Sequence, residues 1–431
     1  MEHTHESSLK HLAATILVLL LLVHSASAAS DDTYKKLDIF AQVLQYIQNS
    51  YVDRVDSQKI LYGAIRGMLK TLDPHSSFMT PEEFRSMQED TSGNFGGVGI
   101  ELEMREGMLL VVSPIDDTPA KRAGIQAGDQ IVKIDGAPVR KMDVMEATKR
   151  IKGVPGTKVV LTIDRDSFEN PKDFVLIRQR IRINPIQSDL PLPGYGYLRI
   201  RVFTERTEQY MMQALKKLKK DNKAPLKGLV LDLRNNPGGL LNQAIRVADR
   251  FIEKGLIVET RGRSKRLDDS SAHRRGTEPR YPMVCLVNGG SASASEIVAG
   301  ALQDHKRALI MGVRTFGKGS VQTVVGLKDG SGLKLTIARY YTPNHRSIQE
   351  QGIIPDVVVP RSSPVGDTEI HITRESDLDG HLHREGHTDE TRKKLDKIAD
   401  FQLRTALYYL RAWERFGARA PDEKAKNTPK K

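Results

Sequence analysis

The feature of this 431-residue sequence that most restricts its fold is a regular alternation of strand-like and helix-like segments between Pro185 and Pro360. Apolar runs of strand length occur at 195–200, 228–235, 283–289 and 308–313. Between them lie segments with helical periodicity, at 205–220, 241–253 and 294–304, and a hairpin turn follows at 329–332. Strands that alternate with helices form partly parallel sheets. We therefore predict an α/β core over residues 183–362.

The regions on either side of this core have different patterns. Residues 29–92 are predicted to be helical, because apolar residues recur at spacings of three and four, at Leu37, Phe40, Val43, Leu44 and Ile47. Residues 93–182 contain short strands, glycine turns and one amphipathic helix over 142–152, which is typical of a small β-rich module. Residues 363–431 lose apolar periodicity until a helix predicted over 391–416. The fold class is therefore multi-domain α+β.

The N-terminal segment is typical of an export signal. Twelve apolar residues, 12–23, follow Lys10, and Ala26-Ser27-Ala28 provides the small residues of a cleavage site. We predict a signal peptide over residues 1–28 and a periplasmic protein. Glu2 and Glu6 offset the charge of Lys10, so an uncleaved, membrane-associated anchor is the alternative. The single cysteine, Cys285, excludes an intrachain disulfide and any multi-cysteine metal site.

The net charge does not indicate a nucleic-acid partner. The chain has 66 Lys and Arg against 54 Asp and Glu, but the basic residues are spread among acidic ones. Only 424–431 is locally basic, which is typical of a solvated tail. We predict no nucleic-acid binding.

The segment VNGGSASASEIVAGALQD, 287–304, offers a candidate nucleophile. A buried strand ends at Gly289-Gly290 and a helix begins near Ser293, so the Ala294 N–H and the positive end of the helix dipole lie beside the serine hydroxyl. Ser293-x-x-Glu296 is also a capping box. From this segment alone, a helix cap is the more common explanation.

The segment GVRTFGKGSVQTV, 312–324, offers a candidate base. Lys318 lies between two glycines on a loop that leads into a strand. A phosphate-binding loop is disfavoured, because Gly319 stands where Ser or Thr is needed and a strand-like segment follows in place of a helix. A lysine can activate a serine when it is neutral. Gln322, four residues later, has an amide oxygen that can orient the amine without favouring its charged form.

The segment DLRNNPGGLL, 232–241, offers a second oxyanion donor. A strand end is followed by Pro237-Gly238-Gly239 and a helix, so a glycine amide can point at a reacting carbonyl. The sequence leaves the choice between Gly238 and Gly239 open.

Histidine-based sites are less favoured. No G-x-S-x-G elbow is present, and His75, His305 and His345 are isolated. His371, His381, His383 and His387 lie with Glu385 in a charged stretch without an H-E-x-x-H pattern. We predict a solvated linker there, and neither a metal nor a cofactor.

The β-rich module contains a candidate peptide site. Gly97-Val98-Gly99-Ile100 has the form of a carboxylate-binding loop, whose successive amides can hold a peptide's C-terminus. The peptide would then lie as a strand beside 100–103. Val144, Ala147, Thr148 and Ile151 share one helix face and would form an apolar pocket. Glycine turns and a core stripe are the alternative explanation.

Together these segments resemble the carboxyl-terminal processing peptidases, also called tail-specific proteases. The resemblance covers nearly the whole chain up to Pro360 and lies in LDPHSSF, GGVGIELE, AGIQAGDQI, DLRNNPGG, SASASEI, TFGKGSVQ and IPDVVV. It implies a crotonase/ClpP-like protease core and a PDZ-like module that binds the substrate's C-terminus. It also implies that Ser293 is the nucleophile, Lys318 the base, Gln322 its orienting residue, and Ala294 with Gly238 or Gly239 the oxyanion hole.

The resemblance has limits. Several relatives carry an arginine at the position of Lys152. The resemblance therefore does not imply that this charge controls access of the substrate to the catalytic residues. The region after Pro360 is the least similar, and no residue role is taken from it. For partners, the family implies protein or peptide substrates with apolar C-termini, and it allows a homo-oligomer and a regulatory adaptor.

The sequence therefore predicts an exported serine endopeptidase with a Ser–Lys site. Two other functions are disfavoured. A catalytically silent PDZ-type adaptor is disfavoured because all three catalytic residue types are present at the family's spacing. A trypsin-like protease with a PDZ module is disfavoured because the chain lacks a G-N-S-G-G segment, and its module precedes the candidate catalytic region.

Overall fold

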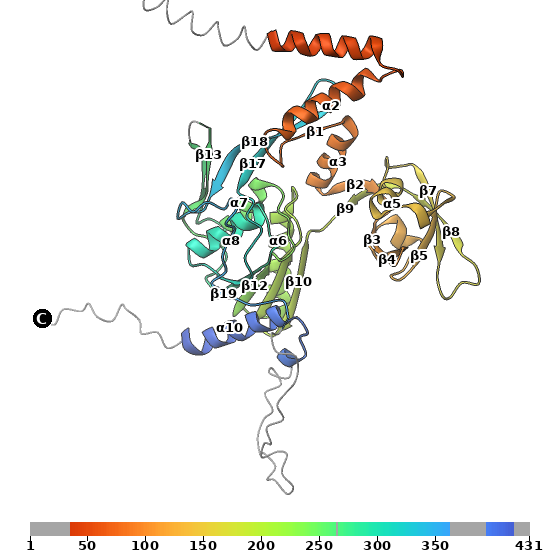
Figure 1. Ribbon diagram of the computed structural model, residues 1–431. Helices are drawn as coiled ribbons and strands as arrows, with labels where there is room; N and C mark the ends of the chain where they lie inside the picture. The colour runs from red at the N-terminus through yellow and green to blue at the C-terminus, as the bar shows by residue number, and fades with distance from the viewer. Residues whose placement is uncertain (1–34, 264–265, 363–393, 418–431) are drawn as a thin grey trace, which may run out of the picture. The chain divides into compact units, whose positions relative to one another are not determined.

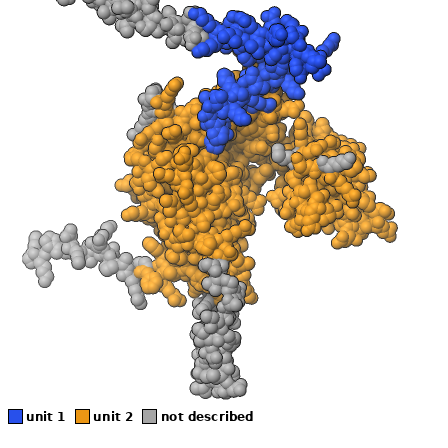
Figure 2. Space-filling view, in the orientation of Figure 1, with its two compact units in different colours: residues 1–78 blue, residues 79–431 orange. Residues whose placement is uncertain are grey.

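The computed structural model describes residues 35–263, 266–362 and 394–417 (Figure 1). The chain divides into two compact units, residues 1–78 and 79–431 (Figure 2). The predicted signal peptide 1–28, the histidine-rich stretch 371–387 and the basic run 424–431 lie outside the described residues. Within the described ranges, no helix combines the length and apolar character needed to cross a bilayer.

The first unit is helical, as its apolar spacing predicts. One helix covers residues 35–50, and α2 (Ser57–Lys70) follows. The side chain of Asp56 begins α2 by accepting hydrogen bonds from the N–H groups of Gln58 and Lys59. The short strand β1 (Ser77–Met79) crosses the boundary between the units.

The second unit contains the predicted α/β core. Its mixed sheet has the order β10-β11-β12-β15-β16-β19. The β10–β11 pair is antiparallel and every later pair is parallel. The strand bounds are Ile186–Leu192, Tyr195–Ile200, Gly228–Asp232, Met283–Val287, Leu309–Gly312 and Val357–Val358, in that order.

Helices cover both faces of this sheet, which explains why its central strands are apolar throughout. Alternate strand residues such as Leu229, Leu231 and Cys285 pack against α6 (Thr207–Asn222), α7 (Leu241–Asp249) and α8 (Ala294–Asp304). The intervening residues, among them Val230, Val284 and Leu286, pack against α10 (Phe401–Gly417). The C-terminal helix begins at Phe401, ten residues later than predicted, after a short helical turn at 394–396.

A second, antiparallel sheet adjoins the core. Within it, β18 pairs with both β17 and β13, and β13 pairs with β14. The bounds of β17, β18, β13 and β14 are Ser320–Gly326, Gly332–Tyr341, Gly255–Gly262 and Arg266–Ala272, in that order. The hairpin of β17 and β18 was predicted from its turn. The hairpin of β13 and β14 was not predicted, because the sequence of β14 is as polar as that of a loop.

Residues 79–182 contain α3 and the β-rich module. In the module's sheet the order is β3-β4-β5-β7-β8, with β6 paired to β5, while β2 pairs separately with β9. The helices are α3 (Pro81–Ser92), α4 (Pro119–Arg122) and α5 (Val144–Ile151), with a 3₁₀ turn at Val139–Lys141. The strands β2 to β9 are Asn94–Gly97, Ile100–Arg105, Met108–Pro114, Gln130–Ile134, Ala137–Pro138, Lys158–Asp164, Lys172–Ile177 and Gln179–Arg182. The predicted fold class is confirmed: a mixed α/β core, a β-rich module and helical segments at each end.

Candidate active site

Three sequence motifs meet because they follow three neighbouring parallel strands. The N-N-P-G-G turn follows β12, and the S-A-S-A-S segment follows β15. The loop that carries Lys318, residues 313–319, follows β16 and is called the lysine loop below. Sites in α/β sheets form outside the carboxyl ends of such strands. A hollow of about 1490 Å³ is lined by Gly239 of the first turn, Ser293 of the second, and Lys318 and Gln322 of the third region. The structure thus brings together the residues predicted for catalysis.

Ser293 occupies a strained junction between β15 and α8. Its φ of 54° and ψ of −112° lie outside the regions that residues with a side chain favour. Its N–H donates to Oε2 of Glu296 at 2.7 Å, which is one half of the predicted capping box. The Glu296 N–H donates to the Ser293 carbonyl oxygen at 2.9 Å. Reciprocal hydrogen bonds between Ser293 and Glu296 thus form the start of α8.

The serines on either side of Ser293 are structural. Ser291 and Ser295 are both 0% exposed. The hydroxyl of Ser291 donates to the carbonyl of Leu233 at 2.8 Å, and that of Ser295 donates to the carbonyl of Asn236 at 2.9 Å. Both acceptors belong to the turn that follows β12. The outer serines therefore hold the N-N-P-G-G turn against the Ser293 segment, a role that their sequence spacing did not reveal.

Lys318 is half-buried and Gln322 lies on β17. The amide nitrogen of Gln322 donates to Oγ of Ser320 at 2.9 Å and to Oγ1 of Thr336 at 3.3 Å. These two bonds use the amide hydrogens and leave Oε1 as an acceptor. Ser320 and Thr336 thus hold the Gln322 side chain in place. Gln322 and Lys318 both line the hollow.

The structure distinguishes the two candidate glycines. The Gly238 N–H donates to Oδ1 of Asn236 at 2.9 Å, so it is already occupied. The N–H groups of Gly239 and Ala294 have no acceptor among the hydrogen bonds of the described residues. Gly239 also lines the hollow, whereas Gly238 does not, and a Cβ at Gly238 would meet the backbone of Ala292 and Ala294. The geometry favours Gly239 and Ala294 as paired amide donors.

A buried ion pair supports the turn that carries these glycines. Asp232 ends β12 and is 0% exposed. Arg234 donates to it from Nε at 2.9 Å and from Nη2 at 2.6 Å, and its remaining donors reach Asp400 and Gln402 of the C-terminal region. These contacts raise the pKa of the Arg234 guanidinium, against the effect of its burial. Sequence reasoning missed this cluster, since nothing local links D-L-R to residue 400.

Part of the hollow's lining is apolar, although charged residues such as Arg85, Glu89 and Asp268 also line it. Leu241, Ile245, Val321 and Tyr340 line it beside the candidate catalytic residues. Burial raises the pKa of Tyr340 to about 12, so its phenol stays neutral at physiological pH. The apolar part of the lining suits an uncharged side chain of a bound polypeptide.

The predicted carboxylate-binding loop has the expected backbone. Gly97 ends β2 and Ile100 begins β3, while Gly99 has a φ of +80° and no room for a Cβ beside Thr118. Within the described chain, the N–H groups of Val98 and Gly99 have no hydrogen-bond acceptor. Ile151 ends α5 but is only 5% exposed, and it packs with Val98 in the core of the module. Val144 and Thr148 are the half-buried residues of that helix face.

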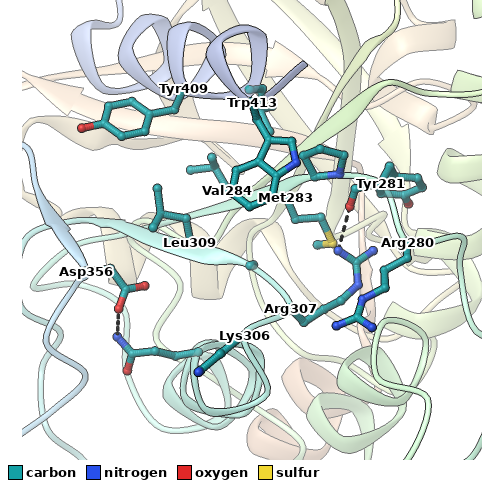
Figure 3. A pocket seen from close by; sticks show the side chains of 14 residues that line it. Arg280, Tyr281, Met283, Val284, Lys306, Arg307, Leu309, Asp356, Tyr409 and Trp413 are labelled. Atoms are coloured by element: carbon teal, nitrogen blue, oxygen red, sulfur yellow. Dashed lines mark hydrogen bonds between the residues drawn. The ribbon is translucent and has the colours of Figure 1, made fainter. Parts of the chain in front are cut away.

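A second hollow, of about 850 Å³, shares no lining residue with the first (Figure 3). Tyr409 and Trp413 of α10 lie over Val284 and Leu309 of the sheet, and the Arg307 guanidinium donates to the Tyr281 carbonyl at 2.8 Å. It contains none of the residues predicted for catalysis.

Comparison with known proteins places the chain in a family. The model of peptidase family S41 matches residues 194–359, and the PDZ domain model matches 96–171. The model of the activating protease CtpB N-terminal domain matches residues 20–83.

Individual relatives match over most of their length. A carboxy-terminal-processing protease of Bartonella bacilliformis is 43% identical over 95% of this chain and 97% of its own. The carboxy-terminal processing protease CtpA of Bacillus subtilis is 38% identical, over 80% and 74% of the two chains. Among solved structures, a photosystem II D1 C-terminal processing protease has 34% identity and a TM-score of 0.45, covering 74% of this chain and 92% of that chain. The chain belongs to the carboxy-terminal-processing proteases of peptidase family S41, and it is a serine peptidase.

Proposed function

We propose that this peptidase uses Ser293 as nucleophile and Lys318 as general base to cut exported proteins near their C-termini. The observation that most supports this site is a contrast among three serines. Ser293 lines a hollow together with Lys318, Gln322 and Gly239, whereas Ser291 and Ser295 are fully buried and hydrogen-bonded to the backbone.

In the proposed reaction, Oγ of Ser293 attacks the scissile carbonyl carbon while the neutral amine of Lys318 takes the hydroxyl proton. The N–H groups of Ala294 and Gly239 donate to the resulting oxyanion. The intermediate collapses, and the leaving amine receives the proton from Lys318. A water molecule, deprotonated by Lys318, then attacks the acyl group, which releases the new C-terminus and restores Ser293.

The PDZ-like module is proposed to capture the substrate's tail. The free N–H groups of Val98 and Gly99 suit a terminal carboxylate, and the edge beginning at Ile100 can accept the tail as an added strand. Val144 and Thr148 would then contact its apolar side chains. Export to the periplasm, by the signal peptide predicted over residues 1–28, belongs to the same proposal. A homo-oligomer and a regulatory adaptor stay predictions.

The test compares full-length wild type, Ser293→Ala, Lys318→Arg and the control Lys216→Ala on a model protein with an apolar tail. Lys216 is exposed on α6 and is not among the residues that line the hollow. Ser293→Ala and Lys318→Arg should abolish cleavage, because an arginine cannot give up its proton. The control should cleave at the wild-type rate, and a charged tail should be spared.

Three results would count against the proposal. Cleavage that survives Ser293→Ala would point to another nucleophile. A rate that falls from acid towards neutral pH would exclude a lysine base, since the neutral amine becomes more abundant as pH rises. Binding of the tail without cleavage by wild type would favour the adaptor function.

A further inference from the structure

We infer that Glu296 is a positioning residue that sets the nucleophile and the base in register, an inference that rests on the proposed function above. Its Oε2 accepts the N–H of Ser293 at 2.7 Å and the N–H of Lys318 at 2.9 Å. One oxygen atom therefore joins the backbones of the two residues proposed for catalysis, although 25 positions separate them in the sequence.

The second oxygen of Glu296 holds the rest of the lysine loop. Its Oε1 accepts the hydroxyl of Thr315 at 2.6 Å and the N–H of Gly317 at 2.7 Å. Thr315 in turn accepts the N–H of Ile353 at 2.6 Å, which ties the loop to the segment before β19. The loop that presents Lys318 is thus built around this carboxylate.

The arrangement fills the acceptor positions of the Glu296 side chain. Glu296 is 0% exposed, and four N–H or O–H donors surround it in place of water. A carboxylate has about four acceptor positions, which matches the four donors. A glutamine of the same shape would turn its NH₂ group toward two of these donors, so it would have to release either the Ser293–Lys318 pair or the Thr315–Gly317 pair.

A helix cap alone does not account for this geometry. A capping glutamate needs only the N–H of the residue at the helix start, and here three of the four donors come from the lysine loop. A purely structural role predicts lower stability with unchanged chemistry in the molecules that remain folded. A positioning role predicts that kcat falls while KM for the tail substrate stays constant.

The experiment measures kcat, KM and the urea midpoint for full-length Glu296→Gln, Glu296→Asp and the control Glu278→Gln. Glu278 is also a buried carboxylate of the core, and it accepts hydrogen bonds from Lys219 and Tyr281 outside the hollow of Ser293. Because a misplacement of about 1 Å can cost about 100-fold in rate, we expect kcat to fall by about 100-fold in Glu296→Gln. KM should stay within about twofold, and Glu278→Gln should lose stability but keep kcat.

The outcomes separate this inference from the proposed function. Full activity of Ser293→Ala would remove the proposed nucleophile and with it the basis of the inference. With Ser293→Ala inactive, a folded Glu296→Gln that keeps kcat within about threefold would overturn the inference alone. If Glu296→Gln does not fold, Glu296→Asp decides, because it keeps the charge but shortens the reach. Wild-type kcat in that variant would equally reject the positioning role.

Discussion

The guanidinium of Arg234 donates to both carboxylate oxygens of Asp400, at 3.0 and 2.7 Å, across 166 positions of sequence. Asp400 also accepts the N–H of Leu403 at 3.0 Å, so it begins α10 while it holds the arginine. The same arginine is paired with Asp232, which precedes the turn of Gly239. The C-terminal helix is thereby fastened to the strand end from which the N-N-P-G-G turn departs.

Asp400→Asn should lower the free energy of unfolding through loss of the Arg234–Asp400 ion pair alone. The helix cap is kept, because asparagine is as good a helix cap as aspartate. A hydrogen bond between charged groups contributes about 1.5–3 kcal/mol. Asp400 is 38% exposed, and solvent screening reduces that contribution, so we expect a loss of about 1–2 kcal/mol. Urea unfolding measures it, with Asp396→Asn on the exposed preceding turn as the control. An unchanged midpoint in Asp400→Asn would show that the pair adds no net stability.

The same pair should make stability depend on pH in acid. Burial alone would raise the pKa of Asp400, but the hydrogen bonds from Arg234 and from backbone N–H groups lower it below its ordinary value. A carboxyl with a lowered pKa adds stability that is fully present above its unfolded pKa of about 3.9 and is lost as pH falls through the folded pKa. The difference in unfolding free energy between wild type and Asp400→Asn should therefore be constant near neutrality and shrink below about pH 4. A difference that grows in acid would contradict this assignment.

The two outer serines should differ in their effects. Ser291→Ala leaves the Asn288 N–H without its acceptor, a bond of 3.0 Å in the structure, and it also removes a donor to Leu233. Ser295→Ala is milder, because the Asn236 carbonyl keeps the Ala292 N–H at 3.0 Å. We expect a loss of about 1–3 kcal/mol for Ser291→Ala and less for Ser295→Ala, with residual activity in both. Thermal unfolding and cleavage assays on the two variants test the order, and abolished cleavage in either folded variant would count against a purely structural role.

Gly239→Ala should damage the N-N-P-G-G turn and the proposed oxyanion donor in it. A Cβ at this position would lie 2.2 Å from the carbonyl oxygen of Phe203, and the φ of +135° disfavours any side chain. Loss of one oxyanion donor costs about 100- to 1000-fold in kcat, and we expect a decrease of that order. Gly289→Ala is the control, since its Cβ would meet no atom within 4 Å. Equal kcat values for the two variants would exclude Gly239 as a donor.

Local patterns predicted more of the fold than of the site. The strand at 195–200 and the helix at 294–304 were predicted at their observed bounds, because apolar periodicity and the chain's turn residues act over a few positions. The capping box likewise indicated the Ser293–Glu296 contact. It did not indicate the other donors to Glu296, nor the link from Arg234 to Asp400, because each needs the packed sheet to bring distant loops together. The sequence pattern did not predict the strand β14, because its residues are mostly polar. It also predicted the start of α10 too early in the chain.

The backbone of Ser293 has a consequence for how this protein can change over generations. A residue with a side chain at φ 54° and ψ −112° costs about 1–3 kcal/mol, whereas glycine adopts such values freely. Ser293→Gly should therefore raise the free energy of unfolding. If Ser293 is the nucleophile, as proposed, a lineage that no longer needs hydrolysis would gain stability by this one replacement.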